Sequence, residues 1–317
     1  MYFFSHLRGD TIGEMRLFIA LGVGIVGFAC VAAAQPAENP ALQNTGKPMI
    51  LPYLCGEEDI RSAGLSCTID DPCAVFLELA SVEAVGNRIF VAGNIHSSST
   101  TLYSVLLASD DGGKTWHEPH ERIRLAGLDR IQFIDFENGW VAGEVQHPLP
   151  RDPFLLATTD GGKTWQAQPI FGDPQFGAIV DFWFQSRTSG VLSIYRGGAG
   201  GNGQYELYET PNAGETWMLR QTSERLIELM QHSPNADWRL RPDAASKSNR
   251  VEHRVGGQWH SVAAFSVGLA ACQPPEPSGP PPAPSGPPPA PSAPPPAPSG
   301  PPPAPAGDAP PALQRSR

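Results

Sequence analysis

An all-β domain built from repeated units is the fold class that the sequence predicts, and three observations predict it. Three short segments, at residues 109–116, 158–165 and 210–217, align with one another without gaps. The tryptophans that end them recur at intervals of about 50 residues, which fits one unit of four strands. Strand-like apolar runs precede each segment. The repeats therefore indicate one β domain over residues 75–272.

Each aligned segment reads Ser/Thr-x-Asp/Asn-x-Gly-x-Thr-Trp, which is typical of a tight hairpin turn. The Asp or Asn can accept hydrogen bonds from amides of its own turn, and the Gly supplies a positive φ. The Thr favours resumption of a strand, and the Trp can be buried between neighbouring units. We expect a structural role for Ser109, Asp111, Gly113, Thr115, Trp116, Thr158, Asp160, Gly162, Thr164, Trp165, Thr210, Asn212, Gly214, Thr216 and Trp217.

Three strand-like runs before the turn and one after it make each repeat a four-stranded blade. In the second repeat these runs are 131–135, 140–143 and 154–157. A fourth, degenerate copy is expected around Trp238, 250–253 and Trp259, with 261–269 as its last strand. The prediction is a β-propeller of four to five four-stranded blades. The sequence leaves open whether the ring closes or is incomplete and needs a partner.

The N-terminus predicts export from the cytoplasm. Arg16 precedes an apolar run from Leu17 to Val31, and Ala32-Ala33-Ala34 offers a small-residue cleavage site, so residues 1–34 are interpreted as a signal peptide. The run is shorter than a membrane-spanning helix requires. The expected location is periplasmic, cell-surface or secreted, with no integral membrane segment after cleavage. An uncleaved anchor and lipidation of Cys30 are the alternatives.

Cleavage would leave four cysteines, an even number that predicts two disulfides in an exported protein. Three of them lie at or near an N-terminal extension, residues 35–74, and the fourth follows the last repeat. Three pairings are possible, and a bond from the last cysteine back to the extension would tie the ends of the domain together. The cysteines are Cys55, Cys67, Cys73 and Cys272.

The C-terminal tail, residues 273–317, differs in kind from the repeats. Units of the type Ser-Gly/Ala-Pro-Pro-Pro-Ala-Pro recur from Ser278 to Pro305 and carry no charge and little apolar surface. Such a segment cannot form a core, so we expect a disordered polyproline II spacer. It could serve as a tether, as a ligand for a proline-binding domain, or as a neutral repeat.

The second repeat resembles a known family. Residues 131–135, 138–143 and 155–165 are similar to the repeat unit of the photosystem II stability/assembly factor-like family, within the BNR/Asp-box group that also includes sialidases and sortilin-type receptors. The resemblance implies a β-propeller that acts as an exported assembly or binding scaffold. The chain departs from the photosynthetic members in its fewer repeats, its four cysteines and its proline-rich tail. The Asp-box itself is structural and fixes no activity.

Composition and motifs give no catalytic or metal site. The net charge of −10 argues against nucleic acid as a partner. The motif at residues 117–120 lacks a third ligand at usable spacing for a metal, and no cofactor is expected. A sialidase would need three arginines and a Tyr–Glu pair. The candidates are Arg88, Arg122, Arg124, Arg151, Arg196, Tyr195, Tyr205, Glu206 and Glu209.

We therefore expect a non-catalytic scaffold that binds another protein of the cell envelope. The alternatives are a sialidase-like glycoside hydrolase, a carbohydrate-binding protein, and a structural surface protein with a proline-rich stalk. Function tends to lie on variable loops over a rigid scaffold. The loops between second and third strands, 94–99, 144–153 and 196–204, vary most, and the connection 117–124 emerges on the same side. The hypothetical binding face carries His96, His120, Arg122, His147, Arg151 and Arg196.

Overall fold

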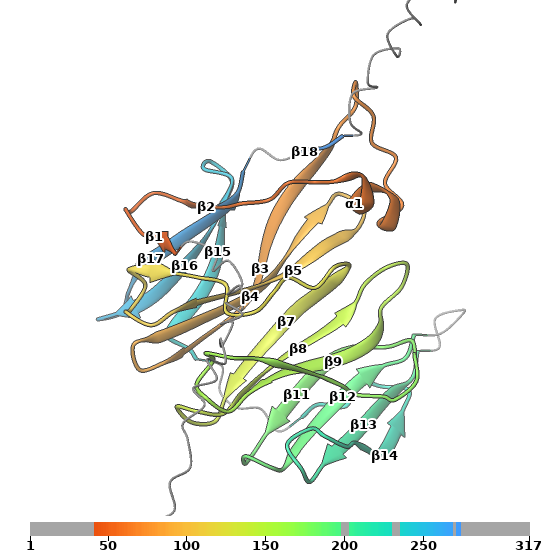
Figure 1. Ribbon diagram of the computed structural model, residues 1–317. Coiled ribbons are helices and arrows are strands. Elements are labelled where there is room, and N and C mark those ends of the chain that lie inside the picture. The colour runs from red at the N-terminus through yellow and green to blue at the C-terminus, as the bar shows by residue number, and fades with distance from the viewer. Residues whose placement is uncertain (1–40, 198–202, 230–234, 269–270, 274–317) are drawn as a thin grey trace, which may run out of the picture.

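The computed structural model describes residues 41–197, 203–229, 235–268 and 271–273, and this part of the chain is almost entirely β-structure (Figure 1). The predicted signal peptide, Cys30 and the proline-rich tail beyond residue 273 lie outside the described residues. No helix within the described residues is long and apolar enough to cross a membrane. The predicted all-β propeller of four-stranded blades is confirmed.

Three antiparallel sheets correspond to the three repeats and follow one another along the chain (Figure 1). Blade 1 contains β3 (Cys73–Val85), β4 (Arg88–Ser97) and β5 (Thr101–Ser109). The chain that lies along the outer side of β5 starts with β6 (Thr115–Trp116). Blade 2 contains β7 (Ala126–Phe133), β8 (Gly139–Val145), β9 (Arg151–Thr158) and β10 (Gln166–Pro169). Blade 3 contains β11 (Ala178–Phe184), β12 (Gly190–Tyr195), β13 (Tyr205–Thr210) and β14 (Met218–Ser223).

The fourth sheet, which we name the closing sheet, combines both ends of the domain. It contains β15 (Trp238–Asp243), β16 (Ser248–Val255) and β17 (Gln258–Val267). Its outermost strand is β2 (Met49–Leu51), which pairs with β17 in parallel. A second N-terminal strand, β1 (Leu42–Gln43), pairs with β6. The residues that the sequence analysis sets apart as an extension therefore supply two strands.

The closing sheet runs in the opposite direction to the three blades. Asn235, just before β15, donates to the Ala84 carbonyl near the end of β3, whereas Asn249 at the start of β16 donates to the Leu77 carbonyl near the start of β3. β15 is therefore antiparallel to β3, although the inner strands of successive blades normally run alike. The expected fourth copy forms strands at all three of its runs, 238–240, 250–253 and 261–269, but it does not repeat the other blades. Trp259 follows the β16–β17 hairpin, and the last strand of the sheet is β2 and not residues 261–269.

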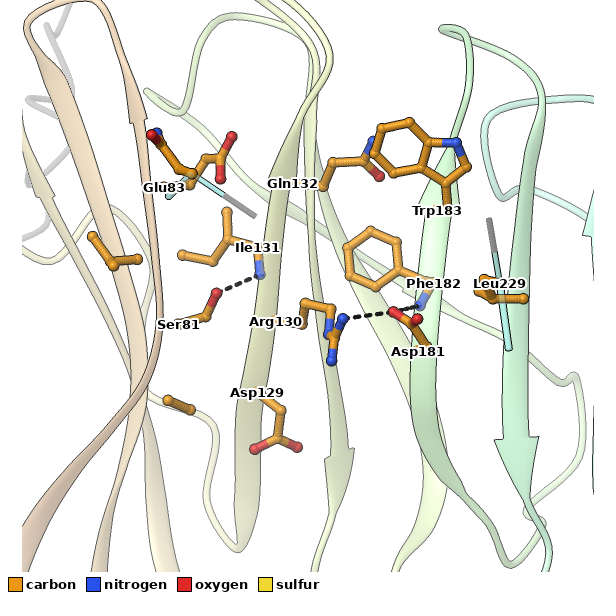
Figure 2. A pocket seen from close by; sticks show the side chains of 13 residues that line it. Ser81, Glu83, Asp129, Arg130, Ile131, Gln132, Asp181, Phe182, Trp183 and Leu229 are labelled. Carbon is orange, nitrogen blue, oxygen red and sulfur yellow. Dashed lines mark hydrogen bonds and ion pairs between the residues drawn. The ribbon is translucent and has the colours of Figure 1, made fainter. Parts of the chain in front are cut away.

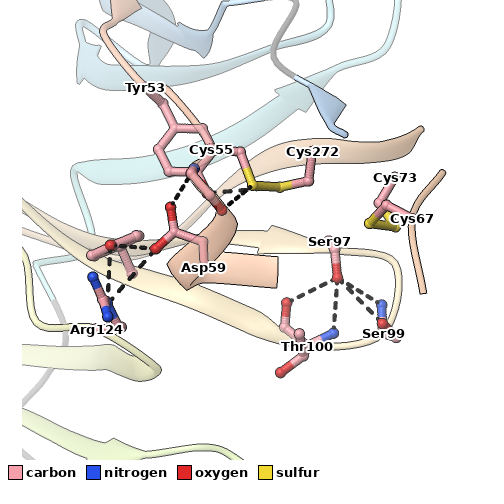
Figure 3. Close-up of a disulfide and its surroundings, with 12 residues drawn as sticks. Tyr53, Cys55, Asp59, Cys67, Cys73, Ser97, Ser99, Thr100, Arg124 and Cys272 are labelled. Atoms are coloured by element: carbon pink, nitrogen blue, oxygen red, sulfur yellow. Dashed lines mark hydrogen bonds and ion pairs between the residues drawn. A yellow bond between two sulfur atoms is a disulfide. The ribbon is translucent and has the colours of Figure 1, made fainter. Parts of the chain in front are cut away.

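Of the three possible cysteine pairings, the structure has Cys55–Cys272 and Cys67–Cys73 (Figure 3). The first bond joins residues 217 apart and ties the short helix α1 (Glu57–Ser62) and the strand β18 (Ala271–Cys272) together. β18 in turn pairs with the first residues of β3. Both ends of the described domain are thus fixed to blade 1.

The core consists of three clusters, each between two neighbouring sheets. One fills the space between the closing sheet and blade 1, the second lies between blades 1 and 2, and the third lies between blades 2 and 3. No interface of comparable extent joins the described strands of blade 3 to β15–β17. The sheets form an open arc in the order closing sheet, blade 1, blade 2, blade 3 (Figure 1).

Candidate functional site

The turn motif is built by one carboxylate that collects hydrogen bonds from its own turn. In the first copy, Asp111 accepts from the amides of Lys114 and Thr115 at 2.9 Å and from the hydroxyls of Ser109 and Thr115. The amide and hydroxyl of Thr115, the Ser109 hydroxyl and the Lys114 amide hold the pKa of Asp111 down to about 2. Gly113 adopts a φ of 91°, which a side chain would disfavour.

The other two copies repeat this arrangement. Asp160 accepts from Thr158, Lys163 and Thr164, and Asn212 accepts from Thr210 and Thr216. An amide in place of the carboxylate thus preserves the turn, so the charge is not essential to it. Each of these side chains accepts hydrogen bonds from its own turn, and no other described group donates to it. This is the geometry of a structural motif.

The first two motif tryptophans pack against the preceding sheet of the arc, whereas Trp217 meets Phe184 of its own blade at 6.1 Å. Trp116 meets Phe265 of the closing sheet edge to face at 5.0 Å. Trp165 meets Phe90 of blade 1 at 6.1 Å. These rings occupy the interfaces between sheets and are not available as ligand platforms.

The centre of the arc holds a cavity of about 370 Å³ that is lined by the inner strands β3, β7 and β11 (Figure 2). Each of these strands has a β-bulge at the same place, at Ala80, Asp129 and Val180. A bulge changes the direction in which the following side chains point. The residues that follow the bulges, Ser81, Arg130 and Asp181, lie in the cavity wall.

Most polar groups of the cavity wall are used in contacts between blades. Arg130 forms an ion pair with Asp181 at 2.7 Å, and Ser81 Oγ accepts from the Ile131 amide at 3.1 Å (Figure 2). Gln132 exchanges two hydrogen bonds of 2.8 Å with the backbone of Phe184. The buried side chain of Leu229, from the segment that connects blade 3 to the closing sheet, adds apolar surface. These contacts hold the blades in place and leave few polar side chains of the cavity wall free to take part in a reaction.

Three carboxyl groups at or beside the cavity have raised pKa values. Burial raises the pKa of Glu83 to about 7. Burial, and then the charge of Glu78, raises the pKa of Asp129. Burial, and then the adjacent Asp129, raises the pKa of Glu144 to about 8. These carboxyls are not predicted from the sequence, because the bulge at Asp129, which brings that residue next to Glu144, leaves no mark in the sequence pattern.

Replacing Glu144 with glutamine is expected to flatten the pH dependence of stability. An unfolded carboxyl titrates near 4.5, so between there and about pH 8 the folded state holds a proton that the unfolded state has lost. That contribution is complete below pH 4.5 and is lost as the pH rises through 8. Urea unfolding of wild type and Glu144→Gln should show the wild-type free energy of unfolding falling by about 4 kcal/mol more than that of the variant between pH 5 and pH 9, with pH 7 as an intermediate point.

The matched control is Glu57→Gln, which changes an exposed carboxyl of α1. It should lie parallel to wild type at all three pH values. A wild-type free energy of unfolding that does not fall between pH 5 and 9 would contradict the proposed protonation of Glu144.

A second depression, the terminal groove, lies at the start of the domain and has a volume of about 670 Å³. One wall is formed by residues 50–54 and the other by residues 118–122, with Gly268 between them. Ile50 and Leu54 keep 60% and 90% of their surface exposed. Glu118 and Arg122 pair with each other at 2.7 Å.

The model of the BNR/Asp-box repeat matches residues 107–118, which hold the first turn motif. The chain carries a BNR/Asp-box repeat. Among solved structures, the chain is similar to YCF48 bound to a D1 peptide, at 17% identity and a TM-score of 0.31 over 62% of this chain and 56% of that one. It is also similar to the GH74 xyloglucanase from Xanthomonas campestris, at 14% identity and a TM-score of 0.29 over 58% and 29%.

YCF48 from Cyanidioschyzon merolae matches at 15% identity and a TM-score of 0.25, over 61% of this chain and 74% of that one. The Asp-box chain spans 56% and 54% of the first two structures, the second being a polysaccharide lyase described as an ulvan lyase. No curated protein matches the chain.

The predicted binding face is spread over three blades. Arg122 and Arg196 are both held within the protein: Arg122 also donates to the Pro52 carbonyl at 2.9 Å, and Arg196 pairs with Glu206 at 2.5 Å. Arg151 lies 3.6 Å from its neighbour Asp152. The structure does not bring these three arginines together, and the binding role of this face stays a prediction.

The three histidines of that face also lie apart. His96 packs against Phe76 with ring centroids 5.7 Å apart. His147 Nδ1 lies 3.4 Å from the Thr100 hydroxyl, and His120 Nδ1 lies 2.6 Å from the Glu121 carbonyl in the terminal groove. In the described residues no three His, Cys, Asp or Glu side chains are grouped so as to hold a metal.

The sialidase alternative finds one partial match. Glu206 partners Tyr208 at 2.7 Å, not Tyr195 or Tyr205, and Arg196 donates to the Tyr208 hydroxyl at 2.8 Å. Burial raises the pKa of Tyr208, which is the wrong direction for a nucleophile. The Arg196 guanidinium also lies 4.4 Å from the Phe171 ring. The cluster is therefore best explained as a structural tie between blade 3 and the connection that precedes it.

Proposed function

We propose that this protein is an exported, non-catalytic β-propeller scaffold that binds another protein of the cell envelope. The observation that carries the proposal is the open arc, in which the described residues place no neighbouring sheet on the outer face of blade 3. In a propeller each blade packs on two neighbours, so an uncovered apolar blade face is a natural interface for a partner.

Strand alternation separates the two faces of blade 3. Phe184, Leu192 and Tyr208 point into the core cluster shared with blade 2. The residues next to them in the strands must point the other way. That outer face carries Val191, Tyr195, Tyr205, Leu207 and Met218, and none of these belongs to a core cluster of the described residues.

The other end of the arc has a different character. On the closing sheet, Arg239 pairs with Glu252 at 2.6 Å and Arg254 pairs with Asp237 at 2.9 Å. Trp259 lies within 4.1 Å of the Arg239 guanidinium. A face of paired charges is stable in water and resembles the polar caps that end repeat arrays. Within the part of the chain that the structure describes, the two ends therefore differ: blade 3 presents an apolar face, and the closing sheet presents paired charges.

A hydrolase is the second candidate, and one observation favours it. Glu83 lines the central cavity and has a pKa raised to about 7, as a general acid requires. Asp129 lies in the same wall. The remaining polar groups of that wall are committed to contacts between blades, so the scaffold has the stronger support.

The test is affinity capture of the tagged full-length protein from its native envelope, quantified by mass spectrometry. The double variant Met218→Glu/Tyr205→Glu places two charges on the outer face of blade 3. Its partner should be recovered at least tenfold less, because burying an unpaired charge in an interface costs more than about 1.4 kcal/mol. Leu219→Glu is the matched control, since Leu219 is similarly exposed but lies on the opposite face of β14.

Two outcomes would contradict the scaffold. One is equal recovery of the partner by wild type, the outer-face variant and the control. The other is polysaccharide hydrolysis by the purified protein that Glu83→Gln abolishes. Either the location of the interface or the absence of catalysis would then be wrong.

A further inference from the structure

The terminal groove exposes apolar side chains that a soluble surface would normally cover. Leu54 is 90% exposed and Ile50 is 60% exposed, and both line the same depression with Pro52 and Tyr53. Tyr53 packs edge to face against Tyr103 at 6.0 Å, which fixes its ring at the groove wall. This wall of the groove is thus apolar and contains one aromatic ring in a fixed orientation.

The groove suits an occupant without charge. Glu118 and Arg122 face each other with two hydrogen bonds of 2.7 Å, so they present a neutral pair to an occupant. His120 uses Nδ1 for the Glu121 carbonyl. In the neutral ring Nδ1 therefore carries the proton, and the other nitrogen, Nε2, is an acceptor for which a serine hydroxyl is a suitable donor.

The C-terminal tail leaves the domain beside this groove. Cys272 is bonded to Cys55, the residue after Leu54, with the two Cα atoms 5.1 Å apart (Figure 3). The Tyr53 hydroxyl lies 3.9 Å from the Cys272 sulfur. The chain beyond residue 273 therefore starts within a few residues of the groove wall.

The composition of the tail matches the groove. From Ser278 to Pro305 it carries no charged residue and consists largely of Pro, Ala, Gly and Ser. Proline-rich segments adopt a preformed polyproline II helix and dock on aromatic-lined grooves. Covalent attachment through a short linker gives an effective concentration in the millimolar range, so even weak affinity would fill the groove.

We propose that the terminal groove binds one proline-rich unit from residues 278–305 of the same chain in polyproline II conformation. Proline rings pack on Tyr53 and cover Ile50 and Leu54, and a serine hydroxyl of the tail donates to Nε2 of His120. The contact anchors the start of the tail to the domain, and the remaining repeats project from that point. This site is separate from the outer face of blade 3, so its test does not depend on the proposed function.

The experiment is photo-crosslinking of the full chain with Leu54→p-benzoylphenylalanine, a substitution at a largely exposed position. We expect the crosslinked product to run as a monomer and its adducts to map to residues 278–305. An excess of a synthetic two-unit tail peptide should lower the intramolecular yield severalfold. The control is Leu149→p-benzoylphenylalanine, which is equally exposed as Ile50 but lies in the β8–β9 loop and should give no tail adducts.

The variant Ile50→Asp tests the groove without changing the tail. It should reduce the tail adducts at Leu54 at least about fivefold, because it places a charge in the apolar wall of the groove. Three results would overturn the proposal. These are adducts at Leu54 that omit the tail, a tail crosslink found only in dimers, and equal tail labelling from positions 54 and 149. A dimer-only crosslink would assign the groove to the tail of a second copy.

Discussion

Replacing Trp116 with alanine is expected to lower the free energy of unfolding by about 3–5 kcal/mol. The side chain is fully buried between blade 1 and the closing sheet, where it meets Phe265, and its indole nitrogen donates to the Gly113 carbonyl at 3.1 Å. The backbone of Trp116 also pairs with β1. The loss would therefore combine a cavity in the core with the loss of one of the two hydrogen bonds to the Gly113 carbonyl, to which Asn44 also donates at 2.7 Å. Urea unfolding followed by fluorescence measures it.

Trp259→Ala is the matched control, because Trp259 contacts Arg239 and Arg254 on the closing sheet and belongs to no core cluster. Cation–π contacts at exposed sites contribute about 0.5–1 kcal/mol, so the control should stay near wild type. Similar losses for the two tryptophans would show that the turn motif does not hold the sheets together as described.

The double variant Cys55→Ser/Cys272→Ser is expected to show the second large effect. The bond joins residues 217 apart, and the chain-entropy model gives about 5 kcal/mol for a loop of this length. The bond also joins the N-terminal segment to β18 and thus to blade 1. Thermal unfolding of the oxidised proteins should show a clear fall in Tm for the variant.

Cys67→Ser/Cys73→Ser provides the comparison, since that bond closes a separation of only 6 residues and the same model gives about 2 kcal/mol. The ratio of the two losses is the informative quantity. Equal losses from both variants would mean that closure of the domain contributes little.

The features that could be predicted from the sequence are the local ones. The turn residues around Asp111, Asp160 and Asn212 interact within a few positions, so a repeated pattern is enough to place them. Alternation and spacing likewise give the strands of blades 1 to 3. Two disulfides follow from the even number of cysteines, but their pairing depends on where β18 lies.

The features that could not be predicted depend on contacts between distant segments. The reversed direction of the closing sheet follows from where Asn235 and Asn249 meet β3, more than 150 residues away in sequence. The bulge at Asp129 leaves no periodic signal, and it creates the carboxyl pair with Glu144. Arg122 and Arg196 are predicted from the sequence to lie on a binding face, whereas in the structure both are held by carboxylates of the same chain.

The measurement that tests the central claim most directly is hydroxyl-radical footprinting of the native full-length protein. The open arc predicts that Tyr205 and Met218 on the outer face of blade 3 are oxidised rapidly, while Tyr208 on the opposite face of the same strand as Tyr205 is protected. Addition of the captured partner should then protect Tyr205 and Met218. Protection of Tyr205 and Met218 to the level of Tyr208 in the isolated monomer would mean that this face is already covered, and would contradict the account.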